Sequence, residues 1–266
     1  MKSGFLLPLW FSCWFVLGAC SSSRENQPAL ERQQYEFAGP GRCDTTRNRG
    51  LDISVSYFLL KDDSEAARLI NDSLRRLATG TVTGWFDGSG EPAAQNTTAQ
   101  TDVAKAAARL AADYNASYLD GVSGCWELKS KADTTFTSPK LLTVQFESYA
   151  YTGGAHPNST VSLYTFDRNS GRSLTLNDLV ADTTALLNVV ERAFRTNQHL
   201  QPQDNLEERG YFLQDGRFPL PANVGMGREG MIFYYNPYEV AAYAVGPIEL
   251  IVPYAQLKHV LRDEWW

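Results

Sequence analysis

A two-residue alternation of apolar and polar side chains restricts the possible folds of this chain more than any other feature of its sequence. The segment LLTVQFESYAY, residues 141–151, shows it most clearly. In a strand, Leu142, Val144 and Phe146 would share one face and polar side chains would occupy the other. Residues 160–167 supply a second strand of similar pattern. Such alternation is typical of an antiparallel sheet that covers a core with one face.

Helical periodicity predicts the segments that pack on this sheet. Ser64 is suited to cap a helix that carries Ile70 and Leu74 on one face and ends at Gly80. The other predicted elements are strands at residues 51–60, 231–235 and 248–252 and helices at residues 102–120, 184–198 and near Leu257. Strands and helices follow one another in runs, without regular alternation of the two. The sequence therefore predicts the α+β class, with a mainly antiparallel sheet packed with several helices.

The beginning of the chain is typical of an exported bacterial protein. Lys2 precedes an apolar run over residues 5–19, which is shorter than the about 20 apolar residues that a membrane-spanning helix needs. Residues 17–20 spell LGAC and resemble a lipobox, whose cysteine receives lipid. We expect a signal peptide over residues 1–19, lipid on Cys20 and a flexible tether over residues 20–40. The alternative is an ordinary signal peptide or an uncleaved anchor.

These features predict the compartment in which the protein folds. A lipid on Cys20 would hold it to a membrane of the bacterial cell envelope, on the periplasmic or outer-membrane face. Because that compartment is oxidising, we expect a disulfide between Cys43 and Cys125, worth roughly 4 kcal/mol in the chain-entropy model. Two buried free thiols are the alternative. No CxxC or HxxxH spacing accompanies these cysteines, so we expect no metal site and no cofactor.

The charge balance bears on possible partners. The formal net charge is −6, which disfavours nucleic acid because phosphate backbones bind basic surfaces. An acidic chain favours a basic protein partner, because opposite charges steer association.

The first candidate site is the segment YTGGAHPN, residues 151–158, between two predicted strands. Its glycines allow positive φ angles, and Pro157 biases the preceding residue toward an extended conformation. An unperturbed imidazole titrates near pH 6.5, which makes His156 a candidate for binding or proton transfer. The candidate ligand-binding residues here are Tyr151, Gly153, Gly154, His156 and Asn158. The alternative is a tight connection in which His156 bonds the loop backbone.

The second candidate site is the segment FYYNPYE, residues 233–239. Tyrosines offer a large contact area with a polar tip, which suits glycan or protein ligands. The candidates are Tyr234, Tyr238 and Glu239, whose carboxylate could meet a basic partner. The alternative is that the tyrosines pack in the core and that Glu239 pairs locally. No GxSxG nucleophile motif is present, and no residue is assigned a catalytic role.

Three fragments, found in order, resemble a known family: YTGGAHPN, LYTFDRNSGRSLTLNDLV and MIFYYNPYEVAAYAVGPIELIVPYAQLKHVL. They are similar to the extracellular domain of unknown function in RsiV, a lysozyme-sensing anti-sigma factor, and in PdaC-type peptidoglycan deacetylases. The resemblance implies an α+β module outside the cytoplasmic membrane, with a PdaC-like half at residues 41–150 and an RsiV-like half at residues 151–266. The deacetylase motif is not complete, because Arg168 stands where its second aspartate would be.

Three functional hypotheses follow. We expect a non-catalytic, envelope-anchored lipoprotein that binds a muramidase or a peptidoglycan fragment, as the resemblance implies. The competing hypothesis is an enzyme that modifies wall polysaccharide, with His156 or Glu239 as general acid or base. The third is a structural scaffold of the envelope.

Overall fold

A computed structural model describes residues 28–38, 43, 46, 49–84, 102–119 and 124–265. The predicted signal peptide and the predicted lipid site at Cys20 lie outside these residues. Within the described ranges, no helix has both the length and the apolar character that a membrane crossing requires.

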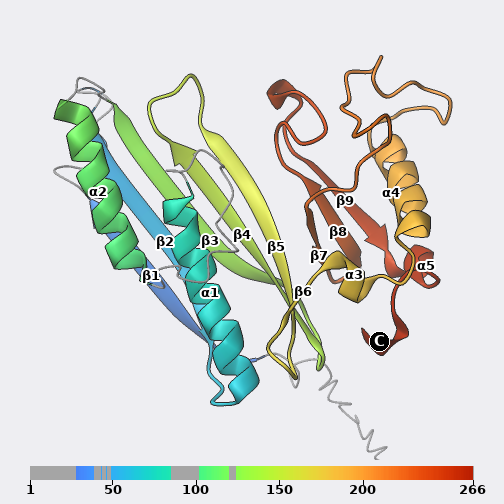
Figure 1. Cartoon of the computed structure of the whole chain (residues 1–266), viewed down its shortest axis with the longest axis horizontal. Helices are drawn as coiled ribbons and strands as arrows, with labels where there is room; N and C mark the ends of the chain where they lie inside the picture. Colours follow the sequence, from blue (N-terminus) through green and yellow to red (C-terminus); the bar gives the residue numbers. More distant parts are fainter. Residues whose placement is uncertain are drawn as a thin grey trace, which may run out of the picture.

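The described residues form two sheets (Figure 1). The larger one holds, in spatial order, β1 (Leu30–Ala38), β2 (Gly50–Leu60), β3 (Cys125–Thr137), β4 (Leu141–Tyr151), β5 (Asn158–Asp167) and β6 (Ser173–Leu174). The smaller one holds β7 (Asn223–Met226), β8 (Gly230–Tyr235) and β9 (Ile248–Pro253). All pairs are antiparallel except β2 with β3. The α+β prediction and its mainly antiparallel sheet are confirmed.

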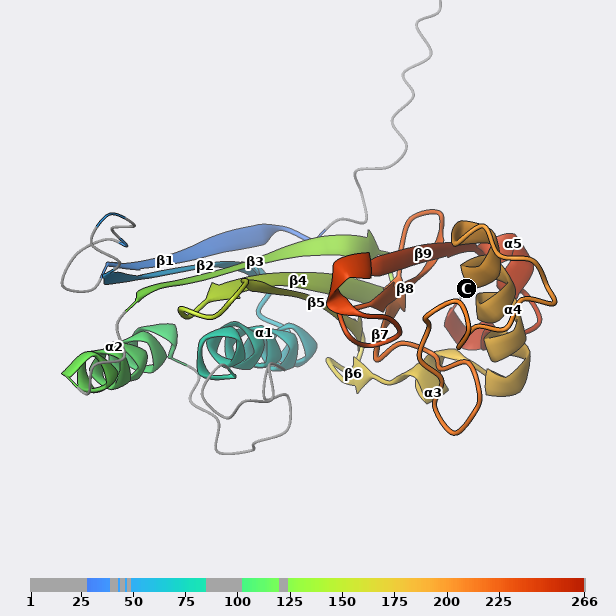
Figure 2. The same ribbon diagram turned by 90° about the horizontal axis from the view of Figure 1, so that it is seen from above.

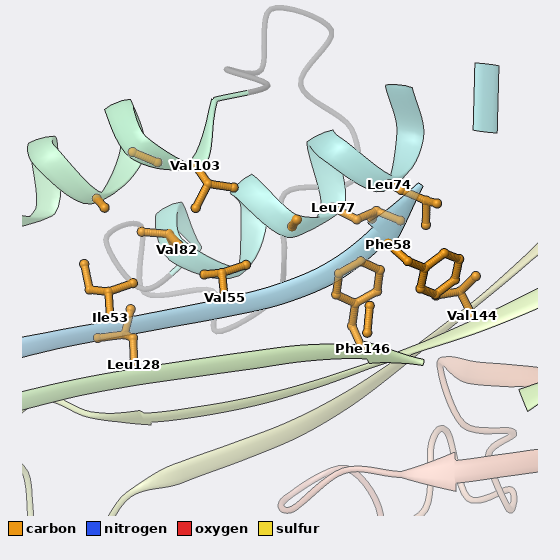
Figure 3. Close-up of a cluster of buried hydrophobic side chains, with 14 of the residues drawn as sticks. Ile53, Val55, Phe58, Leu74, Leu77, Val82, Val103, Leu128, Val144 and Phe146 are labelled. Carbon is orange, nitrogen blue, oxygen red and sulfur yellow. The ribbon is translucent and has the colours of Figure 1, made fainter. Parts of the chain in front are cut away.

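Two helices cover one face of the six-stranded sheet, as Figure 2 shows from above. They are α1 (Glu65–Thr83) and α2 (Val103–Leu119), and they lie between β2 and β3 in the sequence. The opposite face, on which the described part of the chain places no helix, is called the helix-free face below. Figure 3 shows the core under the helices, where Leu74 of α1 and Val55 and Phe146 of the sheet are almost fully buried. Burying such side chains is the main stabilising contribution to this layer.

The start of α1 is as predicted, but its end is not. The side chain of Ser64 accepts the N–H of Ala67 at 3.2 Å, as expected of a helix cap. The predicted end at Gly80 is wrong, because the helix continues to Thr83 and the Gly80 carbonyl accepts the N–H of Gly84. Gly80 is buried inside the helix.

The smaller sheet has its own core, formed with the remaining helices α3 (Leu176–Leu179), α4 (Thr183–Asn197) and α5 (Tyr254–Leu257). Short 3₁₀ turns lie at Tyr243–Val245 and Asp263–Trp265. The two sheets meet where β7 passes β5. A small cluster of Val161, Leu163 and Ile232 joins them on the helix-free face.

Part of the predicted tether is strand β1, so the tether prediction is wrong for Leu30–Ala38. Residues 30–38 pair antiparallel with β2 along their whole length. The sequence did not predict this strand because most of its residues are polar. Tyr35 and Phe37 pack against the core under α1 and α2, whereas Gln34 and Glu36 face solvent. Charged side chains are common on edge strands, because they discourage pairing with another chain.

The expected boundary between the halves, at residues 150 and 151, falls within a hairpin of the larger sheet. Strands β4 and β5 pair from Leu141 with Asp167 to Ala150 with Asn158. The six-stranded sheet ends at Leu174 and the smaller sheet begins at Asn223. Architecturally, the change from one sheet to the other therefore comes after β6.

Candidate functional site

The structure brings the two candidate segments together through a residue that was not predicted, Tyr243. The rings of His156 and Tyr243 stack with centroids 3.8 Å apart and planes inclined by 19°. Tyr243 also neighbours Tyr238, and the centroids of these two rings are 5.5 Å apart. We call these three residues the aromatic platform. His156 and Tyr238 are exposed and Tyr243 is half-buried, so the platform is open to solvent.

Hydrogen bonds fix the platform to the loop between β4 and β5. The Tyr243 hydroxyl donates to the Pro157 carbonyl at 2.8 Å. Nδ1 of His156 lies 2.9 Å from the same carbonyl, within hydrogen-bond distance. His156 is therefore an exposed ring positioned by its own loop and is not a buried structural histidine.

The other candidates of this loop position the platform. Gly153 has φ +86°, a conformation that glycine adopts without a steric penalty. Gly154 has nothing closer than 3.9 Å to the place where a Cβ would stand. Tyr151 ends β4 opposite Glu127, and Asn158 begins β5 opposite Ala150. These residues belong to the tight connection that holds His156.

Glu239 holds the turn that carries Tyr238. Its two carboxylate oxygens accept the backbone N–H groups of Ala222 at 2.6 Å and of Asn236 at 2.8 Å. The side chain of Asn236 in turn bonds both the N–H and the carbonyl of Val161, at 2.8 and 2.9 Å. This network ties the turn after β8 to strand β5.

Tyr234 lies apart from the platform contacts and faces the helix-free side of the larger sheet. It is half-buried against Val161 and Leu163 and pairs across the strands with Glu249. Burial raises the pKa of its phenol, and the negative charges of Glu249 and Glu147 raise that pKa further. It lines a groove together with Pro237.

Tyr243 is the functional candidate that the sequence did not single out. It stands in the run AAYAVG, among alanines and before Gly246, which has φ +79°. A tyrosine flanked by alanines and followed by a turn glycine is a weak signal for an exposed ring. The sequence alone did not indicate that this turn would lie beside Pro157.

Two family models match the chain in sequence order. The model for deacetylase PdaC matches residues 46–159, and the model for a protein of unknown function, DUF3298, matches residues 177–255. The chain carries a PdaC-like/DUF3298 domain of unknown function. The resemblance to PdaC-type proteins is thereby confirmed.

Solved structures of DUF3298 proteins share the fold. One from Bacteroides fragilis aligns with TM-score 0.66 at 20% identity, over 90% of this chain and 96% of that one. Another, from Pseudomonas aeruginosa, aligns with TM-score 0.64 at 17% identity, over 91% and 97%. At these identities the likeness concerns the fold of the PdaC-like/DUF3298 domain alone.

Curated relatives match a shorter region. The immunogenic proteins MPB64 of Mycobacterium bovis and MPT64 of Mycobacterium tuberculosis are each 26% identical over 126 residues, 44% of this chain. The chain spans about half the length of these relatives, 51%.

The TFDR segment of the PdaC-like/DUF3298 domain, residues 165–168, ends strand β5 at Asp167 and enters a turn at Arg168. Asp167 accepts hydrogen bonds from Asn169 N–H and Ser170 O–H, and the Arg168 guanidinium donates to the Ser138 carbonyl. Among the residues that the structure describes, no group of three or more His, Cys, Asp and Glu side chains could hold a metal ion.

The predicted disulfide is present between Cys43 and Cys125, with Cα atoms 5.1 Å apart. Cys125 begins β3 beside the start of its parallel neighbour, Gly50 of β2. The crosslink therefore lies at one end of the larger sheet, beside the parallel pair.

Proposed function

We propose that this PdaC-like/DUF3298 domain is a non-catalytic binding module of the cell envelope, held to a membrane by lipid on Cys20. Its ligand is cell-wall-associated, either a muramidase or a peptidoglycan fragment. The observation that supports this proposal best is the aromatic platform, in which three rings from two segments distant in the sequence gather at the surface.

The platform has the properties of a binding surface. Tyr238 is 58% exposed and Val245, in the same turn as Tyr243, is 51% exposed, so apolar area is available for contact. Tyrosine is enriched among residues that dominate binding energies, because it buries a large area at low conformational cost. The hydrogen bonds to Pro157 order the rings of His156 and Tyr243 before binding, which reduces the entropy lost on association.

The charge of the chain agrees with a muramidase ligand of basic character. The formal net charge of −6 would raise the rate of encounter with a basic protein, in a manner that salt weakens.

The enzyme hypothesis has less support from the same residues. Both oxygens of Glu239 accept backbone N–H groups, so this carboxylate already has a structural role. His156 is stacked on Tyr243. A general acid and base would need to converge on one bond of a substrate, and these contacts give His156 and Glu239 separate roles.

The test is calorimetric titration of the protein with lysozyme and with purified muropeptides. We expect one of these ligands to bind, and Tyr238→Ala and His156→Ala each to weaken that binding about tenfold or more without lowering the unfolding midpoint. Leu69→Ala is the matched control, because Leu69 is a large apolar side chain that is 47% exposed on α1 and is not part of the platform. Binding of neither ligand, or equal binding by Tyr238→Ala and the native protein, would refute the proposal.

The lipid anchor is tested separately. Cys20→Ser should move the protein from the detergent phase to the aqueous phase on partitioning. A variant that stays in the detergent phase would contradict lipidation at Cys20.

A further inference from the structure

A groove of about 600 Å³ lies on the helix-free face of the six-stranded sheet. Strands β2 to β5 form its floor, and residues of the smaller sheet and its loops, among them Tyr234 and Glu249, form its wall. This volume is within the range of about 300–1,000 Å³ that is common for small-ligand sites. None of the three rings of the platform lines it.

Strand register arranges the floor as two rows of polar side chains that run across the strands. In one row, Ser54 of β2, Lys129 of β3 and Tyr149 of β4 are direct neighbours, and Ser159 of β5 follows. In the next row, Lys131 of β3 stands beside Glu147 of β4. Side chains of alternate residues point to the same face, so both rows face the groove.

The lining of the groove contains as many basic as acidic side chains. Lys129 and Lys131 are its basic side chains, and Glu147 and Glu249 are its acidic ones. Both lysines already have acidic partners, since Lys129 pairs with Glu127 at 2.6 Å and Lys131 pairs with Asp133. A strongly anionic ligand would therefore gain little net attraction here.

The floor is unsuited to an extended peptide. Within the groove, the backbone groups of β2, β3 and β4 are used in pairing between these strands. A peptide could not add to the sheet as a further strand at this place, because such recognition needs a free strand edge.

We propose that this groove binds a neutral oligosaccharide. Serine, lysine and glutamate side chains offer the donors and acceptors that sugar hydroxyls need. The rings of Tyr149 and Tyr234, with Pro237 and Pro247, supply apolar area for the C–H faces of the sugars. This site is additional to the proposed function, because it does not require the platform to bind anything.

The groove and the platform are neighbours along the chain at two points. Pro237 lines the groove and precedes Tyr238, while Ser159 lines the groove and follows Asn158. A saccharide in the groove would leave the platform rings accessible, because none of them lines the groove.

The test is an NMR titration of the isotope-labelled protein with chitotetraose and cellotetraose, with a heparin-derived tetrasaccharide as the charged comparison. We expect amide signals of Lys129, Glu147 and Ser159 to shift with one or both neutral sugars. Tyr149→Ala should weaken this binding about tenfold, whereas Tyr149→Phe and the platform variant Tyr238→Ala should retain it.

Three results would overturn the inference: no shift of the groove signals with either neutral sugar, tighter binding of the heparin tetrasaccharide, or unchanged affinity in a folded Tyr149→Ala variant. If lysozyme or a muropeptide still binds the platform in that case, the proposed function stands and only the groove assignment fails.

Discussion

At the scale of single residues, the backbone of Tyr238 is held in a conformation that few residues with a side chain adopt. Its φ is +71°, in the left-handed region. The bonds made by Asn236 and Glu239 maintain the turn around it. Unfavourable backbone conformations persist where surrounding contacts enforce them, and they are frequent at functional positions.

We predict that the free energy of unfolding of Tyr238→Gly exceeds that of Tyr238→Ala by about 1 kcal/mol, because glycine has no Cβ to strain in this region. Tyr238→Gly should therefore unfold at a higher urea concentration. Both variants should lose affinity for the ligand equally, since both lack the ring. Asp215, with φ +51° in another loop, is the matched control. Asp215→Gly should likewise be more stable than Asp215→Ala but should leave ligand affinity unchanged. Equal stability of the glycine and alanine variants at position 238 would show that the backbone there does not strain a residue with a Cβ.

Asp178, in the first turn of α3, makes a contribution to the stability of the fold that depends on pH. Its carboxylate accepts the hydroxyl and backbone N–H of Thr175, at 2.7 and 2.8 Å, and the Arg172 guanidinium donates to it at 2.8 Å. These contacts lower the pKa of Asp178 from 3.8 to about 2, so the folded state favours the charged form.

When folding lowers the pKa of a carboxyl group, that group stabilises the folded state. This stabilisation is fully present at pH values above the pKa of the unfolded state and is lost as the pH falls toward the pKa of the folded state. We predict that Asp178→Asn lowers the free energy of unfolding at pH 7 by about 1 kcal/mol, the usual size of a capping contribution. The difference between the native protein and the variant should shrink as pH falls from about 4 to about 2. Urea denaturation at several pH values measures both, and a constant difference across that window would contradict the assignment.

At the scale of elements, the approach of β7 to the larger sheet depends on a glycine. A Cβ on Gly225 would stand 2.8 Å from Cγ2 of Thr143 and 3.2 Å from Cβ of Leu163. Beside it, Met226 donates its N–H to Thr143 Oγ1 at 3.3 Å and accepts the hydroxyl of Thr135 at 2.9 Å. The close contact permits these bonds between the two sheets.

We predict that Gly225→Ala lowers the free energy of unfolding by about 1–3 kcal/mol, because the added methyl group forces the sheets apart. Gly154→Ala is the control, since its nearest neighbour would be 3.9 Å away. Denaturation curves of the two variants measure the difference. A Gly225→Ala variant as stable as the Gly154→Ala variant would show that the sheets are not in tight contact.

The elements that could be located from the sequence are those in which apolar residues recur with a regular spacing. Residues 141–151 form β4 with the predicted bounds, because alternation there is nearly complete. Strand β1 was missed because five of the nine residues of Leu30–Ala38 are Gln, Glu or Arg, and its assignment depends on pairing with β2. The end of α1 was misplaced because glycine, which often ends helices, is here tolerated in a buried position.

The candidate site was predictable only in part, for a physical reason. Local sequence marked His156 and Tyr238, since loops with glycine, proline and aromatic residues stand out. Their connection through Tyr243 depends on the packing of a 3₁₀ turn against a loop 86 residues away in the sequence. Such long-range contacts have no local signature.

At the scale of the whole molecule, the disulfide closes the longest connection of the larger sheet. It joins Cys43 to Cys125 across a sequence separation of 82, and α1 and α2 lie within that loop. Closing a loop of this length restricts the unfolded chain and stabilises the folded one by roughly 4 kcal/mol in the entropic description.

We predict that the double variant Cys43→Ser, Cys125→Ser unfolds at a clearly lower denaturant concentration than the native protein. Adding a reductant should lower the stability of the native protein toward that of the variant and should leave the variant unchanged. Equal stability of the oxidised protein and the double variant would contradict the expected contribution.

The central claim, that the aromatic platform is the ligand-binding surface, is tested most directly by hydrogen exchange on the complex. The protein would be saturated with whichever of lysozyme and muropeptide binds in calorimetry, and exchange would be compared with the free protein. We predict slower exchange in residues 153–158 and 237–246, which carry the three rings, and unchanged exchange in α1. Protection confined to α1 and α2, with the platform segments unchanged, would contradict the claim.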